Sequence, residues 1–126
     1  MAKIKIGIVG SRRRDEYRDY KKIKDAFDDI YEEDDWIVSG GCPEGGDRFA
    51  EDIAKNRGIP ILIFYPNWNK YRKGAGFVRN TFIAEESDVL IACVAKDRKG
   101  GTEDTIKKFL RRGKKRGIQE NKLYLV

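Results

Sequence analysis

Short runs of apolar, mostly β-branched residues alternate along this chain with single segments of helical periodicity. This alternation constrains the fold more than any other feature. The runs lie at residues 4–9, 36–38, 61–65, 88–94 and 123–126. Runs of this length and composition are typical of buried strands, and one helix between successive strands implies parallel pairing through right-handed crossovers. The sequence therefore predicts an α/β fold: one doubly wound domain over residues 1–126 with a mainly parallel five-stranded sheet.

The segments between the runs carry apolar residues at spacings of three and four, which is typical of helices with one face on a sheet. The first such segment covers residues 17–31. We expect Asp47 to cap the second helix, which ends at Gly58, and Thr102 to cap the last. A further helix is predicted through residues 77–83, after a glycine-rich aromatic loop.

Composition limits the class of protein. Of the 126 residues, 40% are hydrophobic and 38% are charged, which favours a globular protein over a disordered one. No apolar run approaches the ~18 residues that span a bilayer, and the first residues do not have the pattern of a signal peptide. We therefore expect a soluble, cytoplasmic protein with no membrane partner.

Histidine is absent and cysteine occurs only as Cys42 and Cys93. These two thiols make neither a disulfide framework nor a metal-spaced set, and Ser-His-Asp and Cys-His catalysis are excluded. We expect no metal and no cofactor. Any acid–base chemistry would fall to carboxylates, tyrosines, lysines or water.

The net charge of +6 favours anionic partners. Much of the excess is local, at Arg12–Arg14 and in residues 107–116. Basic surface of this kind attracts nucleic acid, but a simple solvated surface explains it as well.

Four loops that follow the predicted strands share glycines, hydroxyl or basic groups and a helix start. Backbone N–H groups at a helix N-terminus, unobstructed by side chains, bind phosphate. One such loop is explained by an ordinary turn, but four at the same sheet edge favour a ligand site. No loop is a Walker A motif and no G-x-G-x-x-G follows the first strand, which disfavours ATP hydrolysis and dinucleotide redox chemistry. The loops are Gly10–Arg12, Ser39–Arg48, Trp68–Asn80 and Lys99–Thr105.

The order and spacing of the motifs in these loops, over residues 4–113, resemble the SLOG superfamily. That superfamily includes the DNA-processing DprA/Smf proteins and the LOG phosphoribohydrolases, and the resemblance is to its small YspA-related branch. It implies a Rossmann-like fold, a nucleotide or nucleotide-derived ligand, and pairing into a homodimer. The expected ligand-binding residues are Gly10, Ser11, Arg12, Ser39, Gly40, Gly41, Gly46, Asp47, Arg48, Arg79, Asn80, Gly100, Gly101, Thr102 and Thr105.

The LOG branch associates an arginine and a glutamate with cleavage of a nucleotide's N-glycosidic bond. Arg79 matches that arginine by position, and Glu103 and Asp104 lie slightly before the acidic position of the LOG pattern. The resemblance thus makes these three residues catalytic candidates. Acids in the first turn of a helix are also explained by its dipole, and Asp47 is an alternative carboxylate.

Three functions stay open. The first is a nucleotide-binding or sensor domain without turnover, in which Arg12 and Arg79 hold phosphate and Trp68 and Tyr71 stack on a base. The second is a nucleotide N-glycosidase of LOG type, so whether the chain is an enzyme is left open. The third is a DNA-binding module of DprA type that uses the basic last helix.

Overall fold

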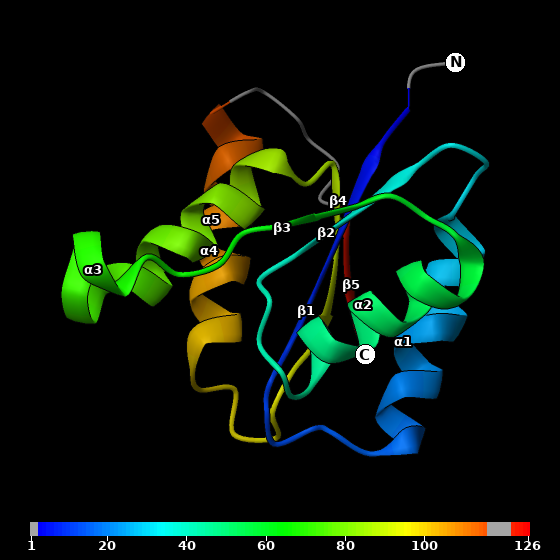
Figure 1. The fold of residues 1–126 in the computed structure, drawn as a ribbon, viewed down its shortest axis with the longest axis horizontal. Helices are drawn as coiled ribbons and strands as arrows, with labels where there is room; N and C mark the ends of the chain where they lie inside the picture. The colour runs from blue at the N-terminus through cyan, green and yellow to red at the C-terminus, as the bar shows by residue number, and fades with distance from the viewer. Residues whose placement is uncertain (1–2, 116–121) are drawn as a thin grey trace.

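The computed structural model of the protein describes residues 3–115 and 122–126, and it is drawn in Figure 1. The elements are, in chain order, β1 (Lys5–Gly10), α1 (Tyr17–Ile30), β2 (Trp36–Ser39), α2 (Gly46–Arg57), β3 (Ile61–Ile63), α3 (Trp68–Tyr71), the 3-10 helix η1 (Arg72–Gly74), α4 (Ala75–Glu86), β4 (Val89–Cys93), α5 (Gly101–Lys115) and β5 (Leu123–Leu125).

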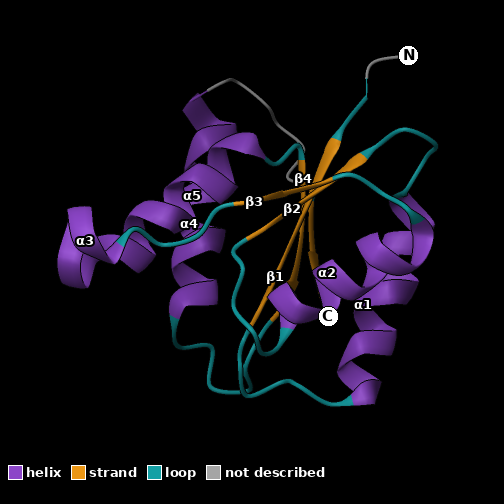
Figure 2. Cartoon of the chain, viewed as in Figure 1, coloured by secondary structure: helices purple, strands orange, loops and turns teal. Residues whose placement is uncertain are grey.

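The five strands form one sheet in the order β3-β2-β1-β4-β5, and every pairing is parallel. Helices α1 and α2 cover one face of the sheet and α4 and α5 cover the other, as Figures 1 and 2 show. The chain moves outward from β1 to β3 and then crosses to β4 on the other side of β1. The predicted α/β, Rossmann-like, doubly wound fold is confirmed, with a sheet that is wholly parallel.

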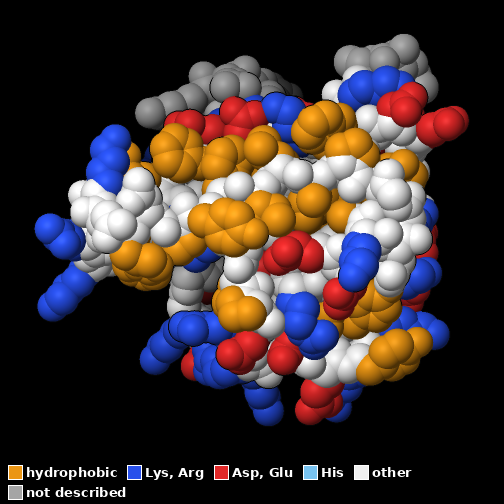
Figure 3. Space-filling view, viewed as in Figure 1, with side chains coloured by type: hydrophobic (Ala, Val, Ile, Leu, Met, Phe, Trp, Pro, Cys, Tyr) orange, Lys and Arg blue, Asp and Glu red, His pale blue; other side chains and the backbone are white. Residues whose placement is uncertain are grey.

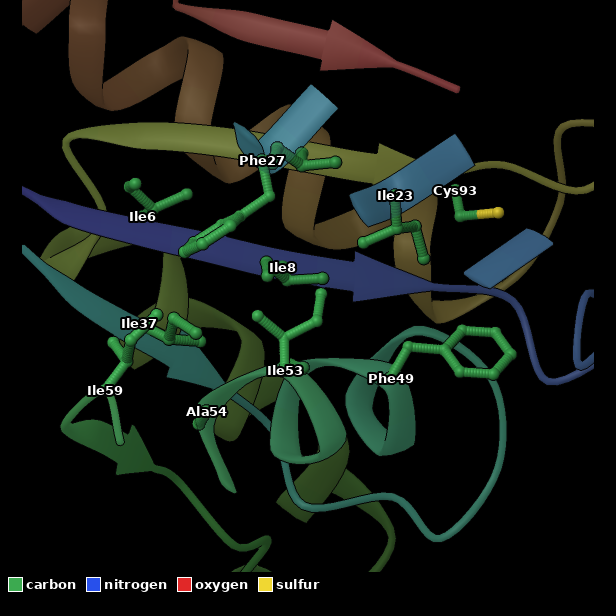
Figure 4. Packing of buried hydrophobic residues seen from close by; sticks show 12 residues of the cluster. Ile6, Ile8, Ile23, Phe27, Ile37, Phe49, Ile53, Ala54, Ile59 and Cys93 are labelled. Atoms are coloured by element: carbon green, nitrogen blue, oxygen red, sulfur yellow. The ribbon is translucent and has the colours of Figure 1, made fainter. Parts of the chain in front are cut away.

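Each face of the sheet has its own apolar cluster, because successive strand side chains point to opposite faces. On one face, Ile8 of β1 packs with Ile23 and Phe27 of α1 and with Ile53 of α2 (Figure 4). On the other face, Val9, Leu90 and Ala92 pack with residues of α4 and α5. Burial of each large apolar side chain contributes about 1.5–3 kcal/mol, so the helix–sheet layers hold the loops between them in place.

The N-terminus of α2 lies directly against the end of β1. A Cβ on Gly46, the first residue of α2, would lie 2.5 Å from the backbone N of Gly10 and from the carbonyl C of Val9. The preceding N-cap residue is Gly45, whose φ of 73° is a conformation that favours glycine. The predicted cap at Asp47 is therefore wrong, since Asp47 lies inside the helix.

Other boundaries also differ from the prediction. The helix α5 begins at Gly101, so Thr102 is its second residue and does not precede it. The strand β3 ends at Ile63, two residues earlier than predicted, and Tyr65 is exposed. Part of the predicted loop at residues 67–76 is helical, and α4 begins at Ala75.

The basic cluster near the C-terminus is only partly visible. Arg116 and the side chains of Lys114 and Lys115 lie outside the described residues. Within the residues that are described, no helix is both long enough and apolar enough to cross a membrane.

Candidate functional site

The loops that follow β1, β2, β3 and β4 meet at the carboxyl edge of the sheet around a cavity of about 910 Å³. The strand order changes direction between β1 and β4, and open parallel sheets bind ligands at such a switch point. In Figure 1 the loops after β1 and before α5 meet below the sheet. Arg13 joins them through a two-bond ion pair with Asp97, with N···O distances of 2.9 and 2.7 Å. This carboxyl-edge cavity lies within the range of about 300–1,000 Å³ typical of small-molecule sites.

Most of the predicted ligand-binding residues come together in the wall of this cavity. They are Gly10, Ser11, Arg12, Gly40, Gly41, Asp47, Arg79, Asn80, Gly100, Gly101, Thr102 and Thr105.

Three predicted residues lie outside the wall. Gly46 is buried against β1, and Arg48 forms an ion pair with Asp15 at 2.8 Å and lies over the ring of Phe49. Ser39 is completely buried at the end of β2, where its Oγ has no well-formed hydrogen bond among the described residues but lies close to Asp47.

Arg79, on α4, is fixed at two of its three side-chain nitrogens. Its Nη1 donates to the carbonyl oxygen of Gly40 at 2.6 Å, and its Nε donates to Oδ1 of Asn80 at 2.9 Å. A guanidinium has five N–H donors, so both hydrogens on Nη2 and one on Nη1 are left without a partner among the described residues. An arginine held this way in a cavity wall suits bidentate binding of phosphate.

Asp47 supplies the carboxylate of the cavity wall and is only 8% exposed. Its Oδ2 accepts a hydrogen bond from the backbone N–H of Cys42 at 3.0 Å. Burial raises the pKa of this carboxyl above its ordinary value; the Cys42 and Gly40 N–H groups and the positive charge of Arg79 oppose the rise. Asp47 thus shapes the loop after β2 and presents an acid to the cavity.

The two acidic candidates in α5 are paired and lie outside the cavity wall. Glu103 forms two bonds with Arg98, at 2.8 and 3.0 Å. Asp104 accepts from Lys108 at 2.8 Å and from Asn80 at 3.2 Å. These partners hold both carboxylates in structural contacts at the start of α5.

Basic groups other than Arg79 also line the cavity: Arg12, Arg13, Lys73 and Lys99. In the space-filling view of Figure 3, Lys and Arg side chains gather at the lower left of the molecule. The first turn of α5 adds the positive end of a helix dipole to the same wall. Asp47 is the one acidic residue in the wall among the described residues, so the cavity favours anions.

Three aromatic side chains stand at the cavity with more than half of their surface exposed: Tyr65 at 65%, Trp68 at 59% and Phe77 at 59%. Of the two aromatic residues predicted to stack on a base, Trp68 lines the cavity and Tyr71 does not. Exposed rings beside a basic wall can stack on a flat, aromatic ligand group.

Sequence reasoning missed Tyr65, Lys73 and Phe77 as cavity residues. Tyr65 ends an apolar run that predicts a strand, and Phe77 is the first of the apolar residues that predict the following helix. Lys73 lies in one of the four loops expected at the site, but nothing in the sequence of that loop distinguishes it from its neighbours Lys70 and Arg72.

The profile of YAcAr, the YspA, cpYpsA-related SLOG family, matches the chain over residues 5–71, which is just over half of its length. The chain belongs to this family. The predicted resemblance to the YspA-related branch of SLOG is therefore confirmed. Membership of YAcAr indicates a role connected with nucleotide-related ligands. Comparisons with curated proteins and with solved structures gave no significant match.

The YAcAr match covers the loops after β1 and β2 and ends at Tyr71. Arg79, Asn80 and the start of α5 lie beyond it, so the family match does not extend to these residues. Among the described residues, no group of three or more Cys, Asp or Glu side chains is arranged to hold a metal ion.

Proposed function

We propose that this YAcAr protein binds a nucleotide or a nucleotide-derived phosphate ligand in the carboxyl-edge cavity, as a sensor or binding domain. The observation that carries the proposal is the composition of the cavity wall. It joins Arg79 and other basic groups, the first turn of α5 and exposed aromatic rings around one space. A ligand with both phosphate and a flat base would use all three features.

The order of the strands supports one orientation of this ligand along the carboxyl edge of the sheet. The aromatic rings of Tyr65 and Trp68 follow β3, and Arg12 and Gly101 follow β1 and β4 on the other side of β2. We infer that the base lies toward β3, where stacking contributes ~1–3 kcal/mol, and that phosphate lies toward β1 and β4. Arg79 reaches Gly40, at the end of β2, and so lies between the two ends.

A second candidate, nucleotide N-glycosidase activity, is favoured by one observation: the buried Asp47 carboxyl in the cavity wall near Arg79. In such a reaction the C–N bond breaks, the base leaves with its electron pair, and the oxygen of a water molecule bonds to the anomeric carbon. The proton that this water loses ends on the base. A carboxylate steadies the positive charge that develops there. Asp47 is better placed for this than Glu103 or Asp104, which are paired outside the wall.

The third alternative, DNA binding through α5, has less support. Lys108 is bonded to Asp104 and to the carbonyl of Phe77, and Arg112 donates to the carbonyl of Ser87 at 2.7 Å. These contacts within the protein use basic groups that a DNA-binding helix would present to phosphates.

The experiment that tests the proposal incubates the purified protein with nucleoside monophosphates, ADP-ribose and related dinucleotides. Thermal shift and chromatographic detection of free base are measured on the same samples. A ligand that raises the melting temperature and stays intact supports the binding domain. Released base supports the N-glycosidase; Asp47→Asn is then expected to abolish release while Glu103→Gln retains it. If no compound raises the melting temperature and none releases free base, both the binding function and the N-glycosidase function are contradicted.

A further inference from the structure

Asn80 is 6% exposed and stands next to Arg79 on α4. Both ends of its amide have partners within the protein. Oδ1 accepts the Nε–H of Arg79 at 2.9 Å, while Nδ2 donates to the carbonyl of Gly101 at 3.3 Å and to Asp104 at 3.2 Å. An asparagine occupied in this way has little bonding capacity left for a ligand.

The partners of Asn80 also fix which way its amide points. The Nε–H of Arg79 can only donate and the carbonyl oxygen of Gly101 can only accept, so the amide oxygen must face α4's arginine and the nitrogen must face α5. Asp104 is held in turn by Lys108 at 2.8 Å. One side chain therefore connects the cavity's arginine with the first turn of α5.

These contacts join the two groups to which the proposed function assigns phosphate, Arg79 and the first turn of α5. Arg79 bonds to Gly40 in the loop after β2, and Gly101 opens α5 after β4. Without a connection, the long arginine side chain would sample many rotamers, and fixing it on binding would cost up to about 2 kcal/mol of side-chain entropy. A preformed arrangement reduces that cost.

We propose that Asn80 is a positioning residue that holds Arg79 and the N-terminus of α5 in one register, so that both meet the same phosphate-bearing ligand. This rests on the proposed function, because it assigns Asn80 to the support of the site and not to contact with the ligand. It differs from the sequence-based expectation, in which Asn80 binds the ligand itself.

The first test needs no ligand. NMR would follow hydrogen exchange of the Arg79 Nε–H in the wild-type protein and in Asn80→Ala, with exposed Glu85→Ala on the same helix as control. We expect this N–H to exchange at least about tenfold more slowly in the wild type and in Glu85→Ala than in Asn80→Ala. Equal exchange in all three proteins would overturn the proposal.

Asn80→Asp tests the contact of the amide oxygen with Arg79 separately from the contacts of the amide nitrogen with α5. This variant also serves if Asn80→Ala does not fold. It keeps an oxygen for Arg79 but sets a carboxylate oxygen against the Gly101 carbonyl and Asp104. The Arg79 Nε–H should stay protected while the amide resonances at the start of α5 shift. Loss of protection at Arg79 with an unchanged α5 would contradict the assignment.

The second test is a double-mutant cycle with AMP and inorganic pyrophosphate as probes, measured by calorimetry. Asn80→Ala should weaken binding about tenfold in the wild-type background. When Arg79 is already alanine, Asn80→Ala should weaken binding much less. The loss in the logarithm of affinity should be less than about half of the loss seen in the wild-type background. An equal loss in both backgrounds would show that Asn80 acts independently of Arg79. If neither probe binds, the proposed function loses support, while the exchange measurement still decides the position of Arg79.

Discussion

Arg79 and Asp47 meet at Gly40. A Cβ on Gly40 would lie 2.7 Å from Nη1 of Arg79 and 2.9 Å from Oδ2 of Asp47, so a side chain there would displace one of the two charged groups. The pair gives the cavity one fixed cation with unused donors and one buried acid. The two residues are therefore the points at which a single substitution tests the site.

Arg79→Ala should weaken nucleotide binding by about 1.5–3 kcal/mol, because a hydrogen bond to a charged group is lost. Arg48→Ala is the matched control, since Arg48 is paired with Asp15 and lies outside the cavity wall. Calorimetric titration with the ligand found in the nucleotide screen measures both. Equal losses in the two variants would mean that the effect of Arg79 is not specific to the cavity.

The raised pKa of Asp47 predicts how stability depends on pH. The protonated carboxyl is favoured in the folded state, so its contribution is complete below the ordinary value of 3.8 and is lost as pH rises through the raised folded value. Asp47→Asn stays neutral throughout. Urea unfolding at a series of pH values should therefore show the variant gaining stability relative to the wild type across this window.

Asp15 gives the opposite sign and serves as the control. The N–H of Gly45 and the guanidinium of Arg48 hold the pKa of its carboxyl below the ordinary value. Here the wild type should gain stability relative to Asp15→Asn as pH rises from the lowered folded value toward 3.8, and then show no further change. The same sign for both variants would contradict the assigned environments.

At the scale of the elements, the contact of α2 with β1 positions the loop after β2. Gly46→Ala should destabilise the protein by ~1–3 kcal/mol, because its Cβ would meet backbone atoms of β1 at 2.5 Å. Gly76→Ala on α4 is the matched control, as nothing lies within 4 Å of its Cβ position. It should be neutral or stabilising by up to about 1 kcal/mol. Urea unfolding of both variants checks the difference.

The sequence was sufficient to predict the elements because periodicity reports burial on one face. Ile8 and Ile37 are in the predicted strands and Phe27 is on the predicted helix face, and all three are completely buried. The ends were harder to predict. Apolar Tyr65 could not be told from a strand residue, since its exposure depends on where β3 stops pairing with β2.

The site could be predicted as far as topology determines it. Parallel strands bring the loops after them to one edge, so Gly10, Gly40 and Gly101 were expected near one another. Side-chain partners could not be predicted. Arg48 pairs with Asp15, which lies 33 residues away, so this is a tertiary contact that leaves no local pattern. Glu103 pairs with Arg98, five residues earlier, which is not one of the spacings that a helix brings together.

At the scale of the whole molecule, the described residues form two apolar clusters that share the same sheet. Since β1 contributes Ile8 to one cluster and Val9 to the other, neither layer can unfold without exposing the strand that supports its neighbour. Thermal unfolding followed by calorimetry should therefore show one transition, with equal calorimetric and van't Hoff enthalpies. Two separated transitions would contradict a single domain over residues 1–126.

The central claim is that a nucleotide binds at the carboxyl edge of the sheet. The most direct test is a two-dimensional NMR titration of ¹⁵N-labelled protein with AMP and with ADP-ribose. The account predicts saturable shifts at the backbone amides of Gly10–Arg12, Gly40–Cys42 and Gly100–Thr102, with the outer faces of α1 and α2 unchanged. Shifts confined to those outer faces, or no shifts with either compound at millimolar concentration, would contradict it.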